Sequence, residues 1–140
     1  MLSYGYRQYQ QTQAQTASPG QLVIMLYRGA IKFLVKARSE IEAANIEGAH
    51  HNLLRAQDIM LELMNGLDLS MGDVAHNLQG LYVFMYRRLV EANVKKDAAE
   101  VDEVLAMLRE LLAAWEQAVT AVETGQTTET DRRALAGIGA

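Results

Sequence analysis

The chain lacks cysteine altogether, which excludes disulfide bonds, thiolate metal sites and thiol nucleophiles and fits a reducing compartment. An excess of positive charge is also missing, because 13 Lys and Arg stand against 17 Asp and Glu, a net charge of −4. Such a chain has no broad basic surface to neutralise phosphates, so we expect no nucleic-acid partner. The longest apolar run, residues 22–27, has six residues, whereas a membrane span needs about 20.

The beginning of the chain and its length agree with these absences. Polar residues and tyrosines open the sequence, in place of a basic stretch followed by an apolar one, so we expect no signal peptide. The 140 residues suit one domain with one core. We therefore expect a cytoplasmic protein with a single domain.

Proline occurs only once, at Pro19, and it marks the first predicted helix start. The Ser18 hydroxyl can accept from an otherwise unpaired amide, Pro19 has no amide to leave unpaired, and Gln21 can reach back to complete a capping box. Two further capping signatures follow later in the chain, at Ser70 with Asp73 and at Asp97 with Glu100.

Four stretches carry apolar residues at every third or fourth position, which is the period of an α-helix. They cover residues 22–41, 53–67, 74–92 and 101–122. No stretch alternates with the period of two that a half-buried strand would show. Four helices joined by short links pack most simply as an antiparallel up-down bundle, so we predict an all-α four-helix bundle.

The predicted bundle takes up residues 18–123. The Gln-rich residues 1–17 before it form an N-terminal cap segment. Residues 124–140, where Gly, Thr and charged residues show no period, are predicted to be a disordered tail.

Aromatic residues gather in the cap segment. Disordered tails are poor in aromatics, so we expect these rings to dock, either on the protein's own surface or on a partner. Three of the six tyrosines lie in the first nine residues, namely Tyr4, Tyr6 and Tyr9.

The first three predicted helices carry more apolar residues than one buried stripe requires, since a bundle helix needs an apolar arc of somewhat over about 100°. The surplus favours three alternatives: tightly enclosed helices, a homodimer, or a groove that receives another chain. It comprises Val23, Ile24, Tyr27, Ile31, Leu34, Val35, Leu54, Ile59, Leu61, Met64, Tyr82, Val83, Phe84, Tyr86 and Val90.

Chemistry that would indicate an enzyme is scarce. Glu47 with His50, and Asp73 with His76, imitate the Glu-x-x-His spacing of di-iron bundles. Both pairs lie in the first turn of a predicted helix, where acidic residues favour the helix dipole. There is no P-loop and no GxGxxG motif. We therefore predict a protein that is not an enzyme and has no metal and no cofactor.

Several motifs, taken in order, resemble the FliS family of flagellar secretion chaperones. The resemblance covers residues 4 to about 120. Its segments are Tyr6-x-x-Tyr9, residues 16–22 (TASPGQL), 26–34 (LYRGAIKFL), 55–59 (RAQDI), 62–63, 81–85 (LYVFM), 88–93 (RLVEAN), Asp97 and 114–115.

The resemblance implies a four-helix bundle that binds the C-terminal segment of flagellin, prevents its early polymerisation and delivers it to the flagellar type III export gate. It also implies that the head bearing Tyr6 and Tyr9 lies over the client groove when the groove is empty, and takes part in gate recognition. An alternative is a self-associating helical bundle with another helical client, a homodimer when client is absent. The predicted partner-binding residues are Tyr6, Tyr9, Leu22, Leu26, Tyr27, Ile31, Leu81, Tyr82 and Met85.

Overall fold

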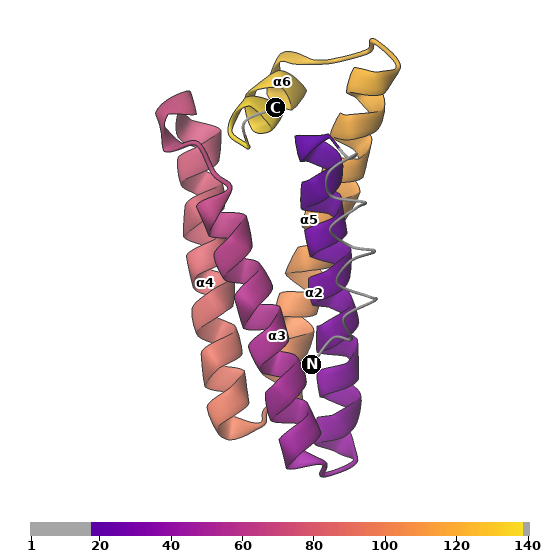
Figure 1. Cartoon of the computed structure of the whole chain (residues 1–140), viewed down its shortest axis with the longest axis vertical. Helices are drawn as coiled ribbons and strands as arrows, with labels where there is room; N and C mark the ends of the chain where they lie inside the picture. The colour runs from indigo at the N-terminus through magenta and orange to yellow at the C-terminus, as the bar shows by residue number, and fades with distance from the viewer. Residues whose placement is uncertain (1–17, 139–140) are drawn as a thin grey trace.

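The computed structural model describes residues 18–138, and all regular structure in that range is helical. This confirms the predicted all-α fold. The elements, labelled in Figure 1, are α2 (Pro19–Glu42), α3 (Ile46–Asn65), the single 3₁₀ turn η1 (Leu69–Met71), α4 (Asp73–Lys95), α5 (Ala98–Glu123) and α6 (Glu129–Ala136).

The start of α2 shows why the sequence begins a helix there. The Ser18 hydroxyl accepts from the Gln21 amide at 3.2 Å, and the Gln21 side-chain oxygen accepts from the Ser18 amide at 3.3 Å. Pro19 occupies the first turn, where its missing amide costs nothing. The predicted capping box is confirmed.

The four long helices run alternately in opposite directions and surround one core (Figure 1). α2 packs beside α3 and α5, and α4 packs beside the same two helices. Across residues 18–138, no helix is long and apolar enough to cross a membrane. The large side chains that the bundle encloses almost completely include Tyr27, Leu34, Leu53, Met60, Tyr82, Met85, Leu89, Leu108 and Trp115.

The predicted cap at Ser70 and Asp73 is wrong. The residue that precedes α4 is Gly72, at φ 106°, and it offers no side-chain cap. Ser70 lies instead in η1, where its hydroxyl and its amide both donate to the Asp68 carboxylate. The Ser70 hydroxyl is therefore hydrogen-bonded within the short 3₁₀ turn and does not cap α4.

The structure also differs from the tail predicted for residues 124–140. Within that range α6 forms, and Thr128 and Asp131 make a reciprocal capping box at its start. Leu135 is buried against the bundle. Eight residues are too few to reveal a helical period, and the docking of α6 depends on an end of the bundle that only the folded chain presents.

Candidate functional site

Two of the predicted partner-binding residues, Tyr27 and Tyr82, meet in the centre of the bundle. Their hydroxyls lie 2.6 Å apart, and Trp115 Nε1 donates to the Tyr27 hydroxyl at 2.8 Å. The two tyrosine rings pack edge to face with centroids 6.2 Å apart. This buried cluster links α2, α4 and α5, so it belongs to the core and not to a surface.

Burial changes the acidity of both phenols. It raises the pKa of Tyr27 to about 12, against partial compensation by the hydrogen bonds from Tyr82 and Trp115. Burial also raises the pKa of Tyr82, and proximity to Tyr27 adds to that effect. Both phenols therefore stay neutral at any physiological pH, and the hydrogen bond between them has a structural role.

The remaining predicted residues do not share one surface. Met85 is fully buried, whereas Leu81 is 37% exposed on α4. Leu26 and Ile31 are partly buried against the core. Because α2 and α4 meet across the core, the structure does not join their outer faces into the single groove that this set would need. Leu22 is half-buried near the start of α2, and Tyr6 and Tyr9 lie outside the described residues.

A groove does exist, between α2 and α3. Its volume is about 270 Å³. At its centre Gly29 permits close packing, since a Cβ there would lie 3.3 Å from Ile59 Cδ1. The apolar lining is Met25, Leu26, Gly29, Phe33 and Ile59.

Of this lining, the predicted site contained only Leu26. The missing members follow a readable pattern, because Met25, Gly29 and Phe33 stand four residues apart on one face of α2. A glycine between two large apolar residues of the same row is typical of a place where another part of the chain approaches the helix closely. The row could have been found in the sequence, but its partner Ile59 could not.

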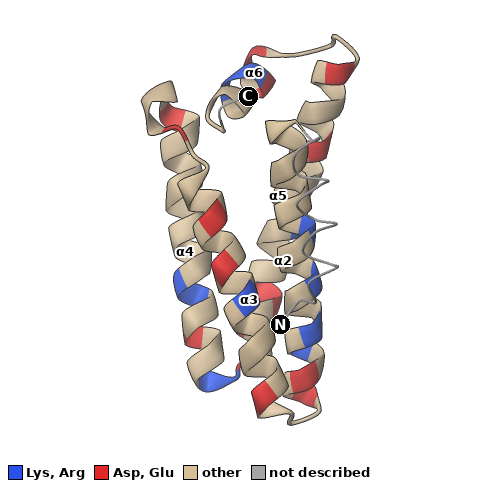
Figure 2. Ribbon diagram, in the orientation of Figure 1, with Lys and Arg blue, Asp and Glu red and all other residues tan. Residues whose placement is uncertain are grey.

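Charged side chains border the groove on both helices. Lys32 and Lys36 lie on the α2 border, and Asp58 and Glu62 lie on the α3 border with Arg55. Figure 2 shows basic residues along α2 and acidic residues on the neighbouring part of α3. An apolar floor with a basic border on α2 and a mixed border on α3 suits an amphipathic segment, which would place its apolar side chains on the floor.

Further apolar side chains are exposed outside the groove. Phe84 is exposed on α4, with the Arg88 guanidinium 5.1 Å from its ring centroid. The exposed large apolar residues on α3 and α4 are Ile46, Leu54, Leu61, Leu81, Phe84, Val90 and Val94. These side chains add apolar surface outside the groove.

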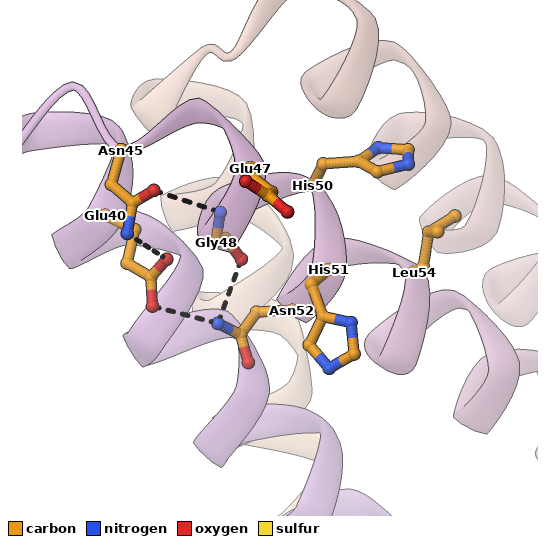
Figure 3. Close-up of a pocket in the computed structure, with 8 residues that line it drawn as sticks. All are labelled: Glu40, Asn45, Glu47, Gly48, His50, His51, Asn52 and Leu54. Atoms are coloured by element: carbon orange, nitrogen blue, oxygen red, sulfur yellow. Dashed lines mark hydrogen bonds between the residues drawn. The ribbon is translucent and has the colours of Figure 1, made fainter. Parts of the chain in front are cut away.

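A polar pocket of about 550 Å³ lies where α2 turns into α3, and Figure 3 shows its lining. The Glu40 carboxylate accepts from the side-chain amides of Asn45 and Asn52, at 3.2 and 3.1 Å. A Cβ on Gly48 would lie 1.4 Å from Glu40 Oε2, so a larger residue here would displace the Glu40 carboxylate. These hydrogen bonds join the end of α2 to the start of α3, so the polar side chains of this pocket have a structural role.

The same pocket contains the Glu47 and His50 pair that imitates a di-iron spacing. His50 contacts the Asn93 side chain of α4 at about 3 Å, and in Figure 3 both imidazoles of the pocket are directed away from Glu40. Among the residues that the structure describes, no three His, Asp or Glu side chains are grouped so that they could hold a metal ion.

Comparison with known proteins gives a consistent result. A family model described as "Flagellar protein FliS" matches residues 2–122. A flagellar secretion chaperone FliS of Bacillus subtilis is 37% identical over 133 residues, which cover 95% of each chain. The FliS of Vibrio cholerae is 36% identical and that of Salmonella typhimurium 37%, each over 81% of this chain and nearly nine-tenths of the relative.

Proposed function

The chain belongs to the FliS family of flagellar secretion chaperones, and from this premise we propose that it binds the C-terminal segment of flagellin, prevents early polymerisation and delivers it to the flagellar type III export gate. Membership confirms the resemblance seen in the sequence. It also makes the protein an export chaperone and not an enzyme. Its place of action, in this proposal, is the cytoplasm, where flagellin is made.

The observation that carries the proposal is the groove between α2 and α3. A segment that is disordered when free must offset its ordering entropy by covering much apolar surface. The floor around Phe33 and Ile59 supplies such surface in a hollow, and exposed side chains such as Leu61 on α3 and Leu81 on α4 extend it around the bundle. Of the predicted residues, Leu26 contacts the client at the floor, and Leu22 and Leu81 border its path.

In the same proposal the cap segment acts as a displaceable lid. Tyr6 and Tyr9 dock on apolar surface when client is absent, and the client expels them, so part of its binding energy is used in displacement. Deleting residues 1–10 should leave the bundle folded and client binding equal or stronger, while delivery to the gate falls. Loss of client binding in this variant would make the tyrosines direct client contacts.

The rival function is a bundle that associates with itself through the surplus apolar surface. Two copies joined in that way would hide the exposed rows on α3 and α4, for example at Leu61 and Phe84. Client and second copy would then compete for one surface, so the mass in solution distinguishes the two functions.

The experiment is a titration of the full chain with a synthetic flagellin C-terminal segment, followed by calorimetry and by mass in solution. We expect saturable binding of one segment per chain, and slower polymerisation of flagellin in the presence of the chain. Flagellin without its C-terminal segment is the matched control and should not bind. No binding, together with a dimer of unchanged mass, would favour the rival.

A further inference from the structure

Helix α6 covers one end of the bundle. In Figure 1 it lies across the top, between the start of α4 and the last turns of α5. Leu135 is its one deeply buried side chain, 8% exposed, with Ala134 and Ile138 packed beside it. The Asp68 amide donates to the Gly137 carbonyl at 2.7 Å and so ties this end to the loop after α3.

Gly20 and Gly137 allow α6 to pack closely against this end of the bundle. A Cβ on Gly137 would lie 3.2 Å from the Cβ of Ala75 in α4. A Cβ on Gly20 would lie 2.8 Å from Val119 Cγ2 and 3.3 Å from Leu135 Cδ2. The end of the bundle is therefore shaped for a helix that carries a leucine followed, two residues later, by a glycine.

The attachment of α6 is nevertheless slight. Apart from Leu135, every buried member of the core cluster belongs to α2, α3, α4 or α5. The link from Glu123 to Glu129 turns at Gly125, whose φ of 76° favours glycine. Segments with few buried contacts open at low cost while the rest of a domain stays folded.

We propose that this end of the bundle is an exchangeable helix-docking site, occupied in one chain by its own α6 and able to take the α6 of a second copy. The occupant follows from the fit, because a second copy presents the same Leu135 in α6 and the same Gly137 directly after the helix. Exchange would join two bundles end to end. It leaves the groove between α2 and α3 open, so it differs from the association that competes with the client.

Concentration decides which α6 is bound. A short flexible link holds a helix near its own site at an effective concentration in the millimolar range, so the docking within one chain prevails in dilute solution. Exchange between copies therefore becomes appreciable as the protein concentration approaches that range, or when the link is too short to reach.

A cross-linking experiment tests the exchange, and the cysteine-free chain makes it specific. The double variant Ala75→Cys with Gly137→Cys should form a disulfide within one chain, since the Cβ separation is close to the 3.5–4.5 Å that disulfides favour. An isotope-labelled Ala75→Cys chain mixed with an unlabelled Gly137→Cys chain at about 1 mM should form the same bond between copies, identified by peptide mass.

The matched control replaces Ala75→Cys with Gly80→Cys, a site on α4 with nothing within 4 Å of its added Cβ, and should give at least tenfold less of the mixed product. Adding Leu135→Asp to the Gly137→Cys chain should remove that product, while the fluorescence of Trp115 shows that the bundle is intact. Cross-linking within the double variant but none between copies would overturn the proposal.

A second variant avoids any dependence on the introduced cysteines. Deleting residues 125–127 keeps the Thr128 cap and leaves only Thr124 and Thr128 between α5 and α6, which disfavours docking of α6 on its own chain. We expect this chain to sediment as a dimer, to return to a monomer when Leu135→Asp is added, and to bind the flagellin segment as the unaltered chain does. A folded monomer in which the α6 amides exchange freely would contradict the proposal without bearing on flagellin binding.

Discussion

Helix α2 has two neighbours, and the two seams that it forms are built differently. Toward α5 the seam is closed by polar links. Tyr27 accepts from Trp115 inside the bundle, and Arg28 lies 3.5 Å from Glu116 at the surface. A further ion pair joins Arg38 to Asp102.

Toward α3 the outer part of the seam is hollow. Gly29 removes a side chain where Ile59 approaches, and Phe33 leaves part of its ring to the groove. In the proposed function, stability depends on the α5 side of α2 and client binding on the groove that faces α3. Substitutions in the α5 seam should therefore change the free energy of unfolding, and those on the apolar floor of the groove the free energy of binding.

The largest effect is expected from Tyr27→Phe. Removing this hydroxyl leaves the Trp115 N–H and the Tyr82 hydroxyl without their partner, and each unmet buried group costs about 1–3 kcal/mol. We expect the free energy of unfolding in urea to fall by about 2–4 kcal/mol.

The matched variant Tyr82→Phe removes one contact and keeps the bond from Trp115 to Tyr27, so it should cost about 1 kcal/mol. Equal losses in the two variants would show that Tyr27 is not the centre of the cluster.

Alkaline pH should weaken the same seam. Burial raises the pKa of Tyr27 to about 12, whereas a phenol in the unfolded chain titrates near 10. The unfolded chain thus loses its proton first, so this contribution to stability is complete below about pH 10. It is lost as the pH rises from about 10 through 12, and it amounts to about 1–3 kcal/mol.

Urea unfolding at several pH values, with tyrosinate absorbance at 295 nm, measures this loss. Tyr82 follows the same direction, since burial raises its pKa too. In the Tyr27→Phe variant the alkaline loss should shrink. The chain has six tyrosines, so the signal of Tyr27 is the difference in absorbance between the folded chain and its folded Tyr27→Phe variant. A difference that already develops near pH 10 would mean that the cluster is open to water.

The four long helices and the caps at Ser18 and Asp97 could be predicted from the sequence because they depend on neighbours along the chain. Ser18 and Gln21 form their box within one turn, and the apolar period of α2 identifies its buried side. The apolar period alone could not show which of the adjacent residues Leu26 and Tyr27 is enclosed in the core and which lines the groove. In a helix with a wide apolar arc, the packing of the neighbouring helix decides which residue is enclosed and which faces a seam.

The groove and α6 could not be predicted for a related reason. Ile59 completes the floor only after α3 has packed beside Gly29, and no spacing within α2 announces that contact. α6 carries a readable cap at Thr128 and Asp131, yet Leu135 is buried only because the bundle has an open end. Both features are properties of the assembled bundle and not of a local segment.

On the α3 side, Phe33→Ala should weaken binding of the flagellin segment by about 1–3 kcal/mol, the range for a groove anchor. Ile59→Ala should do the same from the facing helix. The melting temperature should change little, because both side chains are only partly buried. Calorimetric titration of each variant measures the affinity.

Val94→Ala on α4 is the control, since Val94 is 81% exposed and lies away from the groove. Leu81→Ala tests whether the client's path extends to α4. If Phe33→Ala and Val94→Ala bind equally well, the groove is not the client site. If Phe33→Ala unfolds the bundle, the α3 side carries stability after all.

The smallest effect is expected at the surface of the α5 seam. Arg28 and Glu116 are 63% and 45% exposed, so water and salt screen their attraction. Arg28→Gln should reduce the free energy of unfolding by about 0.2–1 kcal/mol at low salt, and by less as salt rises. A double-mutant cycle with Glu116→Gln measures the pair itself. A coupling energy as large as the loss of stability caused by Tyr27→Phe would mean that the surface ion pair contributes as much to this seam as the buried cluster does. A small, salt-dependent coupling energy would mean that the buried cluster provides most of the stability of the seam.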